Sequence, residues 1–175
     1  MNLPNELWYQ IYNYLSPRSI SKISCIHNLY QLSPEEIRIL DQYEDFSWFF
    51  ATRSGYTKVL EIWINRGVDV NKQNHVKSTA LISSSCGGLI DCVEFLIKSG
   101  ANVNHQNSYG YTALHWACDK GHIQIIKLLL NAGADANIKN KYGDIPRHWA
   151  IRYNRKNKND VLEILDNHSV VKADS

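Results

Sequence analysis

Apolar residues in this chain occur in short clusters at helical spacing, separated by polar turns that contain glycine. Residues 107–139 show the pattern best, because they contain two expected helices that each carry apolar side chains on one face. These side chains are Leu114, Ala117 and Cys118 in the first helix and Ile126, Leu129 and Leu130 in the second. Gly121 fits the turn between the helices, where positive φ is needed. Neither helix can bury its apolar face alone, so the pattern predicts helix pairs that stack on one another.

The pattern repeats every 33 residues, which is the strongest feature of the sequence. One turn occurs three times, as GVDVN at 67–71, GANVN at 100–104 and GADAN at 133–137. Gly55, Gly88 and Gly121 form a second set with the same spacing. A period of this length predicts a solenoid of antiparallel helix pairs, each with an extended finger. The expected units are 41–73, 74–106, 107–139 and 140–168, with 169–175 as a tail.

The best unit carries a family signature. Its segment GYTALHWA at 110–117 resembles the G-x-T-P-L-H-x-A motif of the ankyrin-repeat family, and Gly121-His122 and residues 133–137 continue the family pattern. The resemblance covers nearly three quarters of the chain. It implies an all-α ankyrin-repeat solenoid of about four repeats with hairpin fingers, and a protein that binds other proteins and is not an enzyme.

The first and last units depart from the pattern, as the ends of a solenoid must where they meet water. In place of the opening signature, the first unit has Phe46-Ser47-Trp48-Phe49-Phe50, which suggests an aromatic-tolerant cover from upstream. The last unit has Arg147 where the pattern has a core leucine, and about three extra residues fall within 154–160. We therefore expect 140–168 to be a capping repeat.

The first forty residues lie outside the 33-residue register and are expected to form a small helical module. Pro4 and Pro17 fit helix starts, and SPEE at 33–36 is a further start signal with a serine cap. Residues 3–32 resemble an F-box, whose pattern begins with LPxEL, and F-boxes dock on the Skp-family adaptor of cullin-RING ubiquitin ligases. The resemblance assigns adaptor contacts to Leu3, Pro4, Glu6, Leu7, Ile11, Leu15, Pro17 and Ile20. The alternative is a helical cap that shields the first repeat and binds nothing.

Composition changes this interpretation little. The formal charge is +2 with both signs interspersed, so neither a nucleic-acid partner nor a polyanion-binding face is expected. The four cysteines form no CxxC pair and fit reduced thiols, and no signal peptide, membrane span or prenylation box is expected. We expect a cytoplasmic protein, with the nucleus possible, that is a monomer by itself. The many asparagines and isoleucines favour a large virus or an intracellular microbe as the source, and hence a host cytoplasm.

One group of residues has spacing that fits a metal site. His115, Cys118 and His122 are three and four residues apart, which could place metal ligands together. The repeat explains each of them separately: the resemblance implies that His115 bonds a neighbouring finger, Cys118 fills a core position, and His122 follows a turn glycine. His148 is interpreted in the same way. We therefore predict no metal, no cofactor and no catalytic residue.

The remaining hypothesis is protein binding. By the resemblance, a target would contact finger residues and the inner face of the first helices. The candidates are Tyr43, His75, Tyr109, Tyr111 and Tyr142 from the fingers, and Arg53, Asp119, Lys120, Arg152 and Tyr153 from the helices. Tyr109, Tyr111 and Tyr142 are expected on one concave face, although tyrosines of this kind can also simply pad the hairpins. The sequence thus favours a substrate receptor that links a target to a ubiquitin ligase. A stand-alone binding or decoy protein is the alternative, and an enzyme a distant one.

Overall fold

The computed structural model describes residues 44–153 and 156–173 of the 175-residue chain. The predicted F-box-like module and Tyr43 lie outside these residues. The described residues form eight helices and no strand, as expected for an all-α protein. The helices are α3 (Glu44–Ser54), α4 (Thr57–Asn65), α5 (Ala80–Gly87), α6 (Ile90–Lys98), α7 (Ala113–Lys120), α8 (Ile123–Asn131), α9 (Pro146–Arg152) and α10 (Lys158–Ala173).

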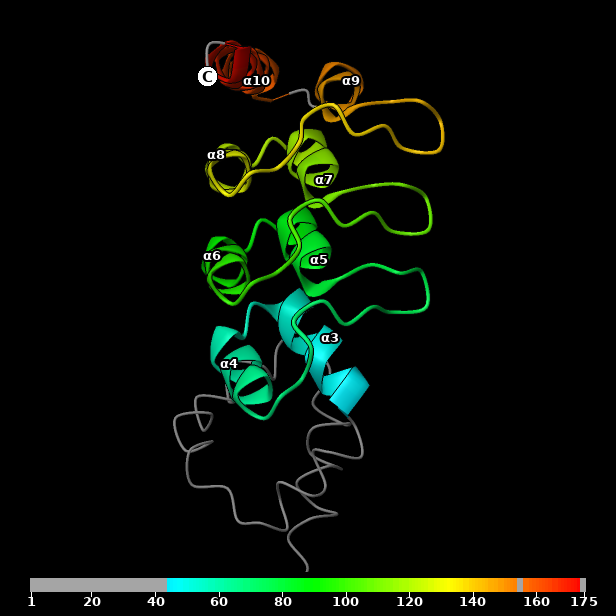
Figure 1. Cartoon of the computed structure of the whole chain (residues 1–175), viewed down its shortest axis with the longest axis vertical. Helices are drawn as coiled ribbons and strands as arrows, with labels where there is room; N and C mark the ends of the chain where they lie inside the picture. The colour runs from blue at the N-terminus through cyan, green and yellow to red at the C-terminus, as the bar shows by residue number, and fades with distance from the viewer. Residues whose placement is uncertain (1–43, 154–155, 174–175) are drawn as a thin grey trace, which may run out of the picture. The chain divides into compact units, whose positions relative to one another are not determined.

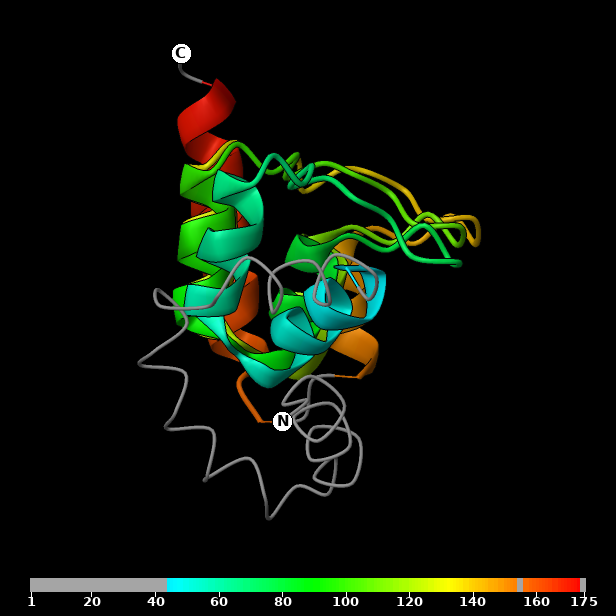
Figure 2. The ribbon, with the colours of Figure 1, turned by 90° about the horizontal axis from the view of Figure 1, so that it is seen from below.

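The helices stack in two rows, which confirms the solenoid (Figure 1). One row contains α3, α5, α7 and α9, and the other contains α4, α6, α8 and α10. Each helix from α4 to α8 packs on the next helix of its own row, and the Ser84 hydroxyl joins α5 to α3 by donating to the Thr52 carbonyl (3.4 Å). The loops between one pair and the next form fingers that project together from the side of the first row (Figure 2).

The best repeat folds as its sequence pattern predicts. Thr112 begins α7 in an extended conformation, and its side chain accepts a hydrogen bond from the backbone N–H of His115. Gly121 ends α7 with φ 69°, and its N–H donates to the Ala117 carbonyl. The six apolar residues predicted to face the core are all buried, and Ile126 and Leu129 are fully so. Burial between helix pairs therefore stabilises this repeat.

Asparagine side chains join each repeat to the next. The Asn71 carbonyl oxygen accepts the backbone N–H of Asn102 (2.7 Å), and that of Asn104 accepts the backbone N–H of Asp135 (2.8 Å). The Asn104 amide also donates to the Gly133 carbonyl (3.1 Å). These bonds explain physically why asparagine closes the turn sequence in successive repeats.

The last helix pair has the features of a cap. Five residues separate α9 from α10, compared with two between α7 and α8, so the turn is three residues longer, as expected. Arg147 stands at the position of the buried Leu114 but is partly exposed and pairs with Asp166. The outer side of α10 is polar, whereas its Val161 and Leu165 are buried. Helix α10 continues to Ala173, past residue 168, where the sequence suggests the end of the last unit.

Candidate protein-binding face

Two asparagines hold the tyrosines of the fingers in place. The Asn107 carbonyl oxygen accepts hydrogen bonds from the backbone N–H groups of Tyr109 (2.9 Å) and Tyr111 (3.1 Å). Asn140 does the same for Tyr142 (2.8 Å) and Asp144 (3.0 Å) one repeat later. An asparagine that closes its own turn in this way fixes the backbone on both sides of the fingertip. The tyrosines therefore project from rigid turns.

Neighbouring fingertips are also bonded to each other. The backbone N–H of Lys141 donates to the Tyr109 carbonyl (3.1 Å), and the backbone N–H of Ser108 donates to the Val76 carbonyl (2.9 Å). Gln106 spans two fingers, because its amide donates to the carbonyls of Gly110 (2.8 Å) and Lys139 (3.0 Å). The fingers thus form one connected surface.

Six aromatic side chains come together between these fingers and the first-row helices. We call them the aromatic cluster: Tyr109, Tyr111, Trp116, Tyr142, Trp149 and Tyr153. Tyr111 lies at its centre, with its ring centroid 4.5 Å from that of Trp149 and 5.7 Å from that of Trp116. Tilted and edge-to-face packing of this kind is favourable for aromatic rings.

The cluster presents its rings to solvent at its edge and buries those at its centre. Tyr142 is 71% exposed, and Tyr109 and Tyr153 are 48% and 49% exposed. Tyr111 is half-buried, and burial raises the pKa of its phenol above the ordinary value. Exposed rings that rest on buried ones form a preorganised apolar platform, which lowers the entropy cost of binding.

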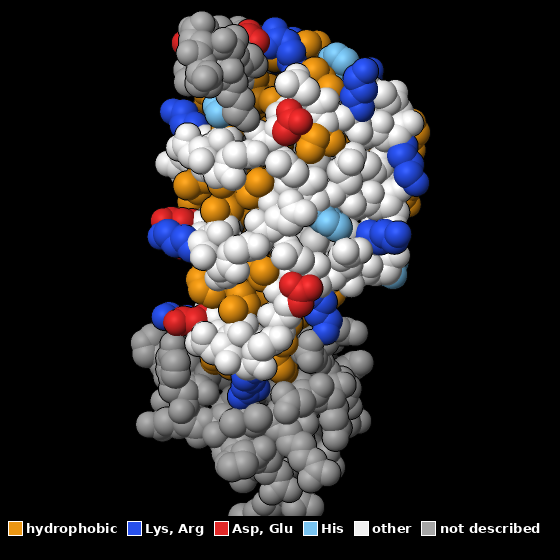
Figure 3. All heavy atoms as spheres, in the orientation of Figure 1, with side chains coloured by type: hydrophobic (Ala, Val, Ile, Leu, Met, Phe, Trp, Pro, Cys, Tyr) orange, Lys and Arg blue, Asp and Glu red, His pale blue; other side chains and the backbone are white. Residues whose placement is uncertain are grey.

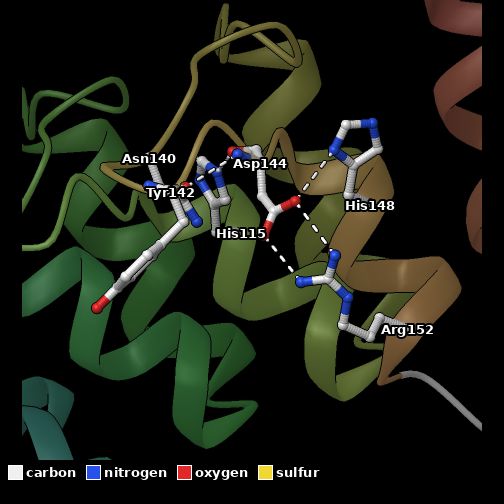
Figure 4. Close-up of polar contacts among 6 residues, drawn as sticks. All are labelled: His115, Asn140, Tyr142, Asp144, His148 and Arg152. Atoms are coloured by element: carbon white, nitrogen blue, oxygen red, sulfur yellow. Dashed lines mark hydrogen bonds and ion pairs between the residues drawn. The ribbon is translucent and has the colours of Figure 1, made fainter.

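A charged group borders the cluster at Asp144 (Figure 4). The Asp144 carboxylate lies 2.9 Å from Arg152 Nη1 and 3.3 Å from His148 Nδ1, and its side chain is only 16% exposed. The Asp144 backbone oxygen is used separately, by His115 Nε2 at 3.1 Å. Arg152 also lies 5.8 Å above the Tyr153 ring. The acid beside the cluster is therefore already neutralised.

The remaining helix candidates fall on equivalent positions of the first row. Arg53 and Asp119 are related by the repeat through Cys86, whose thiol senses the charges of both and of Lys120, while burial raises its pKa. Lys120 lies 2.8 Å from the Asp119 carboxylate. Arg53 is exposed, and so is His75 at the first described fingertip.

The structure brings Tyr109, Tyr111, Tyr142 and Tyr153 together with Arg152 alongside, whereas none of the ring contacts in the described residues joins His75 to the cluster. Sequence reasoning missed Trp116 and Trp149. Their signal was available, because each follows a signature histidine and they are 33 residues apart.

The residues with metal-like spacing are each used in packing. His115 is buried and bonds Thr112 on one side of its ring and Asp144 on the other, as the resemblance implied. Cys118 is fully buried, and burial raises the pKa of its thiol well above the ordinary value. Among residues 44–153 and 156–173, no three His, Cys, Asp or Glu side chains are arranged to hold a metal ion. The expectation that the protein has no catalytic residue stays a prediction.

Stacked helix pairs with projecting fingers define a repeat solenoid, a class of protein that presents an extended surface to partners. The model of the family described as ankyrin repeats matches residues 48–140 as three copies. This match covers more than half of the chain, so the chain belongs to the ankyrin-repeat family, whose repeats support a role in protein–protein interaction. Helices α9 and α10 lie beyond the match.

No curated protein matches the chain at a significant level. In the described part of the chain, no helix combines the length and apolar character needed to cross a membrane.

Proposed function

We propose that the chain is a substrate receptor, which holds a protein target on the aromatic cluster and docks on a Skp-family ligase adaptor through its N-terminal segment. The target part of the proposal is carried by one observation, the presence of the aromatic cluster in two adjacent repeats. The adaptor part is supported by the sequence of residues 3–32 alone.

Repeat 74–106 serves as an internal control for the aromatic cluster. Its helices α5 and α6 form the same kind of pair, and Asn74 closes its finger with the same two backbone hydrogen bonds. It nevertheless has Val76, Ser78 and Ser83 where the next repeat has Tyr109, Tyr111 and Trp116. The fold does not require aromatic rings at these positions, which supports a role in binding.

The chemistry of the cluster fits the centre of a protein interface. Tyrosine and tryptophan bury a large area and keep a polar group, and they are enriched among the residues that contribute most to binding. Tyr142 and Tyr109 have the most area left to bury. A target side chain that covers them would rest on rings already held by Tyr111 and Trp149.

The adaptor part follows from the N-terminal pattern. Leu7, Ile11 and Leu15 recur at helical spacing after the Leu3-Pro4 start, and an apolar stripe of this kind needs a cover. A ligase adaptor would supply that cover from another chain, and catalysis would then belong to the other ligase subunits. The alternative is a stand-alone ankyrin binding protein or decoy in which the same helices cap the first repeat.

Calorimetry with a purified Skp-family adaptor separates these two functions. The receptor hypothesis predicts that the full chain binds, that Leu3→Ala/Pro4→Ala abolishes binding, and that the melting temperature of the repeats is unchanged. Asn5→Ala, in the same segment but outside the assigned contacts, should bind normally. A chain that does not bind the adaptor and loses much of its stability in the double variant would be a capped, stand-alone binding protein.

Target capture tests the other half. Alanine at Tyr109, Tyr111 and Tyr142 together should abolish capture of a target protein while the chain remains folded, as measured by circular dichroism. Alanine at the exposed Lys98, Lys127 and Lys158, which lie on second-row helices, is the matched control and should leave capture intact. Normal capture by the tyrosine variant would show that the target binds elsewhere.

A further inference from the structure

We propose that the partner segment bound on the aromatic cluster is acidic, with an aromatic or aliphatic side chain that packs on the tyrosines and carboxylates that face the lysines of the fingers. This inference rests on the protein-binding function proposed above and adds the chemistry of the partner.

The acids next to the cluster are already paired with cations. Asp144 is held by Arg152 and His148, and Asp119 by Lys120. Two further acids occur in the described finger loops, Asp69 and Asp135. Each accepts a hydrogen bond at 2.8 Å from the backbone N–H two residues further on. These carboxylates are therefore poor sites for a basic partner.

Three lysines on the fingers have no such pairing. Lys77, Lys139 and Lys141 are exposed, and no ion pair in the described part of the chain includes them. We call them the basic rim. Along the outer edge of the fingers, the space-filling view shows Lys, Arg and His side chains, whereas Asp and Glu lie further in (Figure 3). The uncompensated charge beside the cluster is therefore positive.

The basic rim is attached to the same rigid backbone as the tyrosines. Lys141 precedes Tyr142 and bonds the Tyr109 carbonyl through its backbone N–H. The Lys139 carbonyl accepts from Gln106, and the Lys77 carbonyl is bonded by His105 Nε2 at 2.8 Å. The lysines are thus held at fixed positions relative to the rings, with only their flexible side chains free to meet a partner.

The preceding repeat again shows that the fold does not need these charges. Gln106 and Ser108 occupy the positions of Lys139 and Lys141 one repeat earlier, in a finger of the same form. A cationic partner side chain, which exposed aromatic rings can also bind, would meet Arg152 already lying over Tyr153. Positive charge around an apolar platform favours a partner with negative charge around an apolar anchor.

The two features should act on different steps of binding. Exposed charges steer the encounter and speed association, and salt screens them over about 8 Å at physiological ionic strength. Buried aromatic contacts act mainly on dissociation. Loss of the basic rim should therefore slow association in a salt-dependent way, whereas loss of the tyrosines should speed dissociation at any salt concentration.

A displayed library of random 12-residue peptides, selected on the full chain, tests the proposal. The enriched peptides should carry a net negative charge and at least one aromatic or large aliphatic residue. Their binding should be lost in Tyr109→Val/Tyr142→Val, which copies Val76 from the preceding repeat. Enrichment of neutral or basic peptides that still need these tyrosines would overturn the acidic partner and leave the protein-binding face standing.

Kinetics of the best acidic peptide test the role of the rim. The variant Lys77→Asn/Lys139→Gln/Lys141→Ser should lower the association rate about three- to tenfold at low salt, and the difference should shrink as salt screens the charges. The control Lys98→Gln/Lys127→Gln/Lys158→Gln removes the same charge from second-row helices and should change the rate less than about twofold. Equal losses in the two variants would mean that only net charge matters, which contradicts the proposal.

Two further outcomes contradict it outright. If no enriched peptide depends on Tyr109 and Tyr142, both this inference and the proposed binding face fail. A fluorescent 20-nucleotide single-stranded DNA could also use rings and lysines together. Tighter binding of that probe than of any acidic peptide at physiological salt would assign the face to nucleic acid instead.

Discussion

The Nε2 atom of His115 lies 3.1 Å from the backbone oxygen of Asp144, which belongs to the next repeat. On the other side of the ring, Nδ1 lies 3.2 Å from the backbone nitrogen of Thr112. A backbone N–H only donates, so Nδ1 must accept and Nε2 must carry the proton and donate to Asp144. A single neutral histidine therefore holds both the start of α7 and the finger that carries Tyr142.

This arrangement makes stability depend on pH. Burial lowers the pKa of His115 below its ordinary value of 6.5, so the unfolded chain takes up a proton at a higher pH than the folded chain does. The contribution is complete above about pH 6.5 and is lost as the pH falls from there through the lower pKa of the folded state. Melting curves between pH 7.5 and pH 5 should show wild type losing more stability than His115→Gln, which cannot titrate. Parallel losses in the two proteins would contradict the assigned role.

The close approach of two fingers should make Gly110 far less tolerant than Gly143. Both residues have positive φ, 80° and 79°, so alanine costs about 1–2 kcal/mol at either position. At Gly110 a Cβ atom would also lie 2.8 Å from the Asn140 Cα atom and the Lys141 backbone nitrogen, whereas nothing lies within 4 Å at Gly143. Gly110→Ala should therefore cost about 1–3 kcal/mol more than Gly143→Ala in urea denaturation. Equal costs would mean that the fingers separate freely.

Lys77 occupies the left-handed conformation that glycine takes in the two later fingers. Its φ is 57°, and among the described residues it is the one residue other than glycine with positive φ. Lys77→Gly should stabilise the chain by about 0.5–1 kcal/mol, because relief of backbone strain outweighs the added freedom of the unfolded chain. Lys141→Gly, where φ is not positive, should instead destabilise by about 0.5–1 kcal/mol. Thermal unfolding of the two variants checks the difference in sign.

Leu129 tests the stacking of the second row. Its side chain is fully buried in α8, so Leu129→Ala should cost roughly 2–5 kcal/mol of unfolding free energy. Lys127→Ala, on the exposed side of the same helix, should change stability by less than about 0.5 kcal/mol. An unchanged melting curve for Leu129→Ala would be incompatible with the assigned core.

The fold was largely predictable because its signals are local and repeated. Gly121 and the stripe of Leu114, Ile126 and Leu129 specify two helices and a turn within one unit, and the 33-residue period then implies the stacking. The exposed position of Arg147 also followed from its place in the last repeat. Its pairing with Asp166 did not, because nineteen residues separate the two along the chain.

The candidate site was only partly predictable. Tyr109, Tyr111 and Tyr142 were visible as residues near signature glycines, whereas Trp116 and Trp149 occupy a signature position that does not indicate which way the side chain points. Asparagines such as Asn107 and Asn140 are typical of any turn, so their role in holding the tyrosines needed three-dimensional distances. The neutralisation of Asp144 by Arg152 likewise depends on how α9 is placed after its finger. Pairwise geometry between elements is the part that periodicity does not contain.

Site-specific photo-crosslinking tests the central claim most directly, namely that partners bind on the aromatic cluster. Tyr142→p-benzoylphenylalanine places the reactive group at the most exposed ring of the cluster, and Lys127→p-benzoylphenylalanine places it on a second-row helix. With a captured partner or a selected peptide, we predict an efficient crosslink from position 142 and none from position 127. A crosslink from position 127 with none from position 142 would contradict the account.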